Sequence, residues 1–161
     1  IGSAVSIRVA HYHGLGGWRG IRFSAHAGYH LMVAIGIVAT TLVFIFRRQI
    51  TGVFVSNDDP ILFAAISSTV VSKVWPMIFY QVGDGMQTCY VNALRGIGDV
   101  KKLMKYSFIS FGLVTIPLSY LFGIILDGGA VGIWWGFPFG LTLVGILCLR
   151  RFLYHLKRNG L

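Results

Sequence analysis

Four long apolar stretches dominate the sequence, and polar residues gather in the gaps between them. The stretches cover residues 24–46, 74–94, 106–126 and 129–149. Each exceeds the roughly 18 residues that a membrane-spanning helix needs. None shows the strict alternation of a β-strand, and lipid admits only helices or closed barrels. The pattern therefore predicts an all-α, polytopic membrane protein with four transmembrane helices.

Segments beside these spans also carry structural signals. Residues 1–8 are apolar but too short to cross a bilayer, so we expect them to be the end of a truncated, preceding helix. Asp59 followed by Pro60 is typical of a helix start, with a capping carboxylate and a proline in the first turn. We therefore expect one helical segment over 61–94, whose first part lies along the membrane interface. Residues 150–161 are predicted to form a cytoplasmic tail.

The composition fits a membrane protein better than a soluble domain. Of the 161 residues, 55% are hydrophobic and 12% are charged, whereas soluble domains carry about twice that charged fraction. The 14 Lys and Arg outnumber five acidic residues, all of them Asp. A basic chain can bind nucleic acid, but these cations fall between apolar runs, where membrane topology signals occur. We therefore expect a lipid bilayer, and no nucleic acid, among the partners.

The distribution of cations predicts an orientation. Lys and Arg are concentrated before the first span, between the second and third spans, and after the fourth. By the positive-inside rule these segments are cytoplasmic. We therefore predict a multi-pass protein of the plasma (inner) membrane, with the chain start and the C-terminus on the cytoplasmic side.

Asp84 is the one carboxylate deep inside an apolar run. Lys73 lies 11 residues before it and Arg95 lies 11 residues after it. At about 1.5 Å of rise per residue, these two cations are roughly 33 Å apart, close to the hydrocarbon thickness of a bilayer. If both reach the interfaces, Asp84 lies near the midplane. Ionisable residues at that depth are costly and usually serve an ion or substrate path.

Polar residues around Asp84 share one side of its helix. On a helical wheel, a sector of about 120° contains Lys73, Tyr80, Gln81, Asp84, Gln87, Thr88 and Arg95. One-sided polarity in a membrane helix indicates a bundle interior or a water-filled cavity. We predict that Asp84 and Tyr80 bind a cation, Na⁺ or H⁺, with no other cofactor, and that Gln81, Gln87 and Thr88 line the cavity. The alternative is a buried structural Asp that is hydrogen-bonded within the bundle.

No pattern indicates an enzyme or a metal site. His26 and His30 are spaced as metal ligands can be, but no Cys or carboxylate lies near them in sequence. Asp84 has no matching nucleophile pattern, and no Walker-type motif is present. We therefore predict neither catalysis nor ATP hydrolysis on this chain.

Other features have packing interpretations. Glycines recur every four residues over 128–140, which predicts close helix contact. Pro117 and Pro138 are expected to kink their helices. Trp134 and Trp135 fit interface or packing positions.

The residues around Asp84 resemble a family signature. In the multidrug and toxic compound extrusion (MATE) transporters, the tenth helix carries Asp-x-x-Gln followed by Leu-Arg-Gly-x-Gly-Asp, and residues 84–99 are similar to it. Residues 54–60 resemble that family's Phe-x-x-Asp-Asp-Pro entry, and 116–120 its Leu-Pro-x-x-Tyr in the eleventh helix. Residues 6–16 are similar to its loop after helix eight. The resemblance covers the chain nearly end to end.

The resemblance implies two lobes of six helices that export cationic drugs or xenobiotics against an inward Na⁺ or H⁺ gradient. This chain would be the C-terminal lobe of a NorM-type antiporter, from the end of helix eight to helix twelve. Asp84 and Tyr80 would take the positions of the tenth-helix cation site. The N-terminal lobe of the same protein would be the partner, and a cationic small molecule the substrate.

Two alternatives stay open at this point. One is a flippase for lipid-linked sugars in the same superfamily, although such proteins usually favour cationic cavities and the midplane charge here is negative. The other is a small four-helix membrane protein with an assembly or scaffold role, which needs a start codon just upstream of Ile1.

Overall fold

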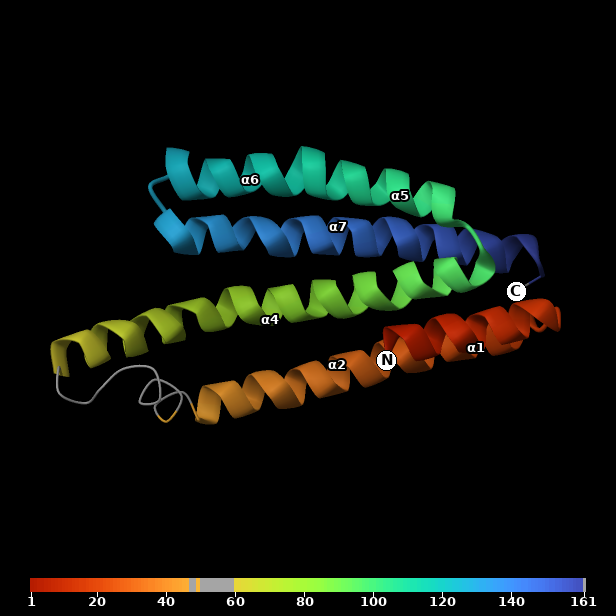
Figure 1. Cartoon of the computed structure of the whole chain (residues 1–161), viewed down its shortest axis with the longest axis horizontal. Helices are drawn as coiled ribbons and strands as arrows, with labels where there is room; N and C mark the ends of the chain where they lie inside the picture. Colours follow the sequence, from red (N-terminus) through yellow and green to blue (C-terminus); the bar gives the residue numbers. More distant parts are fainter. Residues whose placement is uncertain (47–48, 50–59, 161) are drawn as a thin grey trace.

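The described chain folds into a bundle of long helices (Figure 1). The computed structural model describes residues 1–46, 49 and 60–160, and the side chains of these residues outside 60–77. In chain order the helical elements are α1 Gly2–Gly14, α2 Trp18–Ile45, α4 Pro60–Ile97, α5 Val100–Phe108, η1 Ile109–Thr115, α6 Ile116–Tyr120, η2 Leu121–Ile125 and α7 Gly129–Arg158. The described residues contain no β-strand, so the predicted all-α class is confirmed.

The helices have the length and surface of membrane spans. Among the described residues, three stretches are long and apolar enough to cross a bilayer, namely Trp18–Ile45, Val100–Ile125 and Gly129–Arg158. Large apolar side chains such as Val38 of α2 and Ile124 and Ile125 of η2 are exposed. Broad apolar exposure of this kind marks a surface that contacts lipid or another protein. The predicted span 74–94 lies within α4, whose side chains are described from residue 78 onward.

The helices extend beyond the apolar runs that predicted them. Instead of ending near residue 8, α1 continues to Gly14, and α2 begins at Trp18. The turn between them contains Gly16 at φ 67°, a conformation that glycine adopts without strain. The predicted tail is helical up to Arg158. Hydropathy marks the part of a helix that suits the hydrocarbon, whereas a capping residue decides where the helix ends.

The third span is irregular around Pro117. Two π-helical segments, η1 and η2, flank the short α6 in which Pro117 stands near the first turn. Proline cannot donate a backbone hydrogen bond, and π-turns are one way in which a helix accommodates a break in its bonding pattern. The Thr115 hydroxyl donates to the Ser110 carbonyl, five residues back, at 3.1 Å.

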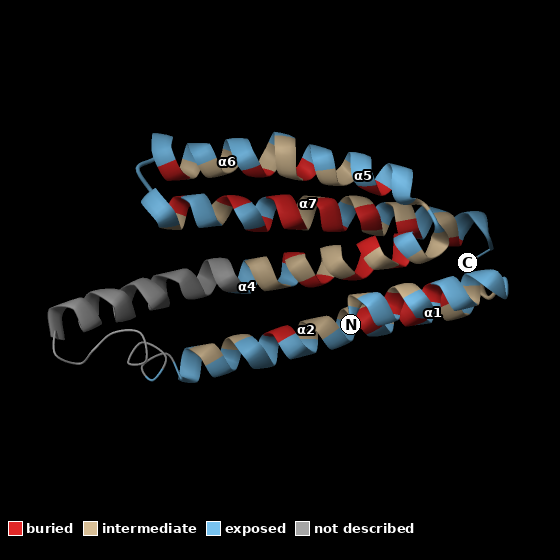
Figure 2. Cartoon of the chain, in the orientation of Figure 1, coloured by how far each residue is buried: buried red, intermediate tan, exposed pale blue. Residues whose placement is uncertain are grey.

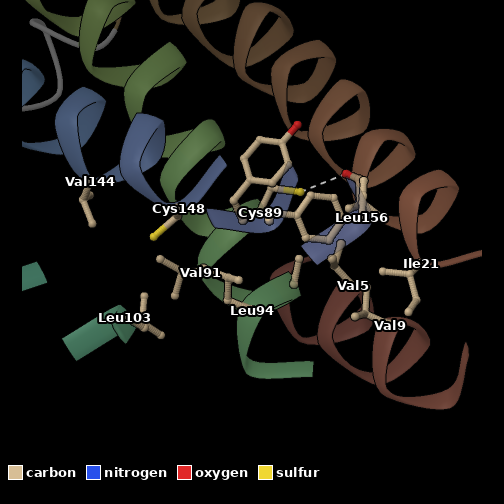
Figure 3. Packing of buried hydrophobic residues seen from close by; sticks show 14 residues of the cluster. Val5, Val9, Ile21, Cys89, Val91, Leu94, Leu103, Val144, Cys148 and Leu156 are labelled. Carbon is tan, nitrogen blue, oxygen red and sulfur yellow. Dashed lines mark hydrogen bonds between the residues drawn. The ribbon is translucent and has the colours of Figure 1, made fainter. Parts of the chain in front are cut away.

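The central helix of the bundle is α4, which packs against α1, α2 and α7. The buried residues of these helices form one cluster toward the end of the bundle where α1 turns into α2 (Figures 2 and 3). Val9 of α1, Ile21 of α2, Leu94 of α4 and Phe152 of α7 are all fully buried in it. The cluster holds α4 on three sides at Leu94, roughly 15 Å along the helix from Asp84.

Glycines bring α7 against the third span, as their four-residue repeat predicts. A Cβ atom added at Gly136 would lie 2.8 Å from the backbone nitrogen of Ser119, and one added at Gly140 would lie 3.1 Å from Cβ of Thr115. The Ser119 hydroxyl also donates to the Ile133 carbonyl at 3.2 Å. Small residues allow the two helices this close approach.

The cation-rich segments lie at one end of the bundle. The turn after α1, the turn between α4 and α5 and the C-terminal end of α7 share that end (Figure 1). Ile1 does not, because it lines the same pocket as Asp84. Over its 13 residues α1 rises by roughly 18 Å before it reaches the cation-rich end. Ile1 therefore lies away from the cation-rich end, and the cytoplasmic location of the chain start and the C-terminus stays a prediction.

Candidate cation and substrate site

Asp84 is half-buried on the face of α4 that looks toward α1 and α2. It lines an open pocket of about 270 Å³ together with Ile1, Gly2, Met32, Ile35, Gln81, Gly85 and Thr88. Thr88, one turn further along α4, lines the same pocket. Among the carboxylates of the described residues, only Asp99 forms a salt bridge. Within that part of the chain, Asp84 is a carboxylate at a pocket without a paired cation.

Two glycines fix the backbone of Asp84 between neighbouring helices. A Cβ atom added at Gly83 would lie 2.8 Å from the hydroxyl oxygen of Thr142 on α7, so no larger residue fits there without a shift. On the other side, the same addition at Gly85 would lie 3.7 Å from Cβ of Met32 on α2, which is ordinary contact. The carboxylate therefore projects from a short stretch of α4 that approaches both α2 and α7 closely.

Gln81 lies where two pockets meet. Its side chain packs directly on the backbone of Gly36 in α2. It lines the Asp84 pocket and also a second pocket of about 310 Å³. The walls of the second pocket include Val33, Ile37 and Thr40 of α2. Gln81 is thus a polar residue between the carboxylate and a mainly apolar recess.

The predicted site residues do not all face one space. Gln81 and Thr88 share the pocket of Asp84, but Tyr80 and Gln87 are not among its lining residues. Tyr80 turns toward α7, where its ring centroid lies 6.2 Å from that of Trp134. Gln87 is half-buried. A polar sector of about 120° is wide enough to meet helices on both sides of α4.

A second carboxylate, Asp99, is held by two side chains of α7. Arg151 Nε donates to Asp99 Oδ2 at 2.6 Å, and His155 Nε2 lies 2.8 Å from the same oxygen. Partial burial alone would raise the pKa of Asp99, but the hydrogen bonds from His155 and Arg151, with the charge of Arg151, outweigh it and lower the pKa. This cluster ties the turn between α4 and α5 to α7.

Sequence reasoning missed the Asp99 cluster. Gly98 has φ 87° and ends α4, and Asp99 directly precedes α5, so the two residues could have been interpreted as a helix stop and a capping position. The partners of Asp99 lie 52 and 56 residues later in the chain. No local pattern reveals a pairing over that distance.

The histidines of α2 take part in hydrogen bonds. The Tyr90 hydroxyl lies 3.3 Å from Nδ1 of His26. His30 Nδ1 lies 2.7 Å from the carbonyl oxygen of His26, one turn earlier. Across the described residues, no three His, Cys, Asp or Glu side chains are grouped as metal ligands.

Fold and site together define a helical, multi-pass membrane protein whose central helix presents a carboxylate to an open pocket beside α1 and α2. Residues 1–121 match the family model MatE. The chain therefore belongs to the MatE family, as residues 84–99 and the other motifs indicate.

Curated relatives match the chain over nearly its whole length. It is 32% identical to "Probable multidrug resistance protein NorM" of Pseudomonas putida over 96% of its length. It is 33% identical to "Multidrug resistance protein NorM" of Aliivibrio fischeri over 99%, and 28% identical to "Multidrug resistance protein MdtK" of Pectobacterium atrosepticum over 94%. These matches cover 33%, 34% and 33% of the three relatives, so the chain spans about a third of their length.

Proposed function

We propose that this chain is part of a secondary active exporter, which moves cationic drugs or xenobiotics out of the cell in exchange for inward Na⁺ or H⁺. Asp84 is the residue at which the exchange takes place. The observation that carries this proposal is the half-buried Asp84 carboxylate, which lines a pocket of about 270 Å³ with Gln81 and Thr88 inside an apolar bundle.

A carboxylate in this setting can trade one positive charge for another. Taking a negative charge out of water without a partner is costly. A cation or a proton that binds Asp84 therefore stabilises the carboxylate in its pocket. Gln81 and Thr88 offer neutral oxygen atoms beside the carboxylate, which suit Na⁺ or the charged group of a substrate. Because a single carboxylate neutralises a single charge, ion and substrate compete for Asp84. Competition for one site is the simplest basis for exchange, since each ligand shifts the protein away from the state that the other binds.

The relatives support the substrate class. Each of the three is called a multidrug resistance protein. Since the chain spans about a third of their length, we propose that an N-terminal lobe of the same protein closes the other side of the transport cavity. We also propose that the cation-rich end of the bundle faces the cytoplasm across the plasma membrane.

The test is the substitution Asp84→Asn in the complete gene, expressed in cells that are loaded with ethidium. The variant keeps the shape of the side chain and removes its charge. We expect the initial efflux rate to fall by more than about tenfold, since losing about 1.4 kcal/mol of cation binding already has that effect. Membrane levels of the protein should stay normal.

Asp127→Asn is the matched control. It removes the same charge from an exposed turn, at φ 50°, where Asn is well tolerated. Efflux should be unchanged in this variant. Full efflux by Asp84→Asn, or an equal loss in both variants, would contradict the proposal.

A further inference from the structure

A groove between α1 and α2 has a mainly apolar lining. Its volume is about 230 Å³, and its walls include Ile1 and Arg8 of α1 and Phe23, Ser24, Ala27 and Leu31 of α2. With the exception of Arg8 and Ser24, every residue that lines it is apolar. We call this space the α1–α2 groove. It takes no part in the proposed exchange at Asp84.

The antiparallel course of α1 and α2 sets the order of residues along the groove (Figure 1). Val5 packs directly against Gly28. From that contact, Arg8 lies one turn further along α1 and Ser24 lies one turn back along α2, so these two residues are level with each other. Ile1 lies one turn in the opposite direction. The groove therefore has a polar end, toward the cation-rich end of the bundle, and an apolar end.

Contacts with α4 place the polar end at the depth of a membrane surface. A Cβ atom added at Gly96 of α4 would lie 2.9 Å from Cβ of Val9, the residue next to Arg8. Gly96 follows Asp84 by 12 residues, which is roughly 18 Å of helix. With Asp84 near the midplane, as the sequence predicts, Arg8 lies close to the edge of a hydrocarbon layer roughly 30 Å thick. The groove thus runs from the membrane surface inward, as a lipid acyl chain does.

The polar end offers unused charge and hydrogen-bonding capacity. Arg8 is exposed and forms no salt bridge with any residue that the structure describes. The Ser24 hydroxyl oxygen is buried and has no hydrogen-bond partner in the described part of the chain, although buried hydroxyls normally have one. Arg19, one turn before Phe23, adds a second exposed cation. Guanidinium groups bind phosphate oxygens especially well.

We propose that the α1–α2 groove binds an anionic phospholipid from the leaflet at the cation-rich end of the bundle. The lipid phosphate lies at Arg8, and the Ser24 side chain rotates to donate to one of its oxygens. An acyl chain follows the groove toward Ile1 and Leu31. A zwitterionic lipid carries its own cation beside the phosphate, so it gains less from Arg8. This inference does not depend on the proposed export function.

The experiment uses phosphatidylglycerol with a photoreactive diazirine on an acyl chain, added to the complete protein in detergent. After irradiation, mass spectrometry of peptides should find the label within residues 23–31. Unlabelled phosphatidylglycerol should compete at a concentration about threefold to tenfold lower than phosphatidylcholine with the same acyl chains, the range expected for one partly exposed charged contact.

Charge variants test the polar end of the groove. Arg8→Gln should abolish the preference for phosphatidylglycerol, and Arg8→Lys should keep part of it. Arg22→Gln is the matched control, because Arg22 is an exposed cation of α2 that does not line the groove. It should keep the full preference. An unchanged preference in Arg8→Gln, or an equal loss in Arg22→Gln, would overturn the proposal.

A second pair of variants tests the apolar part without changing any charge. Ala27 lines the groove and is exposed, so Ala27→Leu fills the groove and should lower labelling of residues 23–31 by more than about threefold. Ala10→Leu adds the same atoms at an exposed position of α1 outside the groove and should leave labelling unchanged. Equal labelling in both variants, or label spread evenly over the apolar surface of the unaltered protein, would also overturn the proposal. If Arg8→Gln fails to reach the membrane, Arg8→Lys and Ala27→Leu decide in the same way.

Discussion

At the scale of single residues, two carboxylates of α4 and its following turn differ in what surrounds them. Asp84 lines an open pocket together with Gln81 and Thr88. Asp99 has Arg151 and His155 on one oxygen. A charge that is already paired stabilises a contact between helices, whereas an unpaired one is available to a ligand. The first carboxylate is therefore a candidate binding group, and the second is a structural clamp.

The Asp99 clamp predicts a pH-dependent stability. The pKa of Asp99 is lowered in the folded protein, so the clamp contributes fully above the ordinary carboxylate pKa of about 3.9 and is lost as the pH falls through the lower, folded value. Asp99→Asn should lower the melting temperature of the complete protein at pH 7, measured by thermal unfolding in detergent. The difference from the unaltered protein should shrink as the pH falls below about 4.

Asp127→Asn serves as the control here as well, because Asp127 is exposed and outside the cluster. It should leave the melting temperature nearly unchanged at either pH. A destabilisation by Asp99→Asn that is the same at pH 7 and at acid pH would contradict the clamp.

At the scale of elements, close contact between α4 and α7 positions the site. Gly83→Ala would place a methyl group 2.8 Å from the Thr142 hydroxyl oxygen, so α4 and α7 must separate slightly. Forcing extra atoms into a packed contact costs about 1–3 kcal/mol. We expect a lower melting temperature and slower ethidium efflux.

Gly85→Ala is the matched comparison for Gly83→Ala. The added methyl group has only ordinary contacts with α2, and alanine favours helix over glycine by up to about 1 kcal/mol. We expect unchanged or slightly higher stability. If the two variants behave alike in thermal unfolding, the contact at Gly83 does not limit the packing of these helices.

The helical elements could be largely predicted from hydropathy, but their details could not. Apolar runs mark the stretches of helix that suit lipid, so the spans in α2 and α7 were found. Hydropathy does not contain the stop at Gly16 or the helical continuation to Arg158. A helical wheel groups Tyr80 with Gln81 around Asp84. It cannot show that Tyr80 faces α7 while Gln81 faces α2, because that depends on where neighbouring helices pack.

At the scale of the whole molecule, the two ends of the bundle differ. The turn after α1, the turn between α4 and α5 and the C-terminal end of α7 form the cation-rich pole, and Asp127 lies in the turn at the opposite pole. If the first pole is cytoplasmic, an impermeant maleimide should label Lys157→Cys only after the cells are opened. It should label Asp127→Cys in intact cells. Cys89 and Cys148 are buried, so neither should react in the folded protein. The reverse labelling pattern would contradict the proposed orientation.

The central claim is that Asp84 binds either the coupling ion or the cationic substrate. The most direct test uses the complete protein, purified into lipid nanodiscs, and follows ethidium binding by fluorescence while Na⁺ or pH is varied at constant ionic strength. We predict that added Na⁺ or added acid displaces ethidium from the unaltered protein, and that Asp84→Asn loses both the tight binding and the displacement. Ethidium binding that is equally tight and equally ion-sensitive in Asp84→Asn would contradict the account.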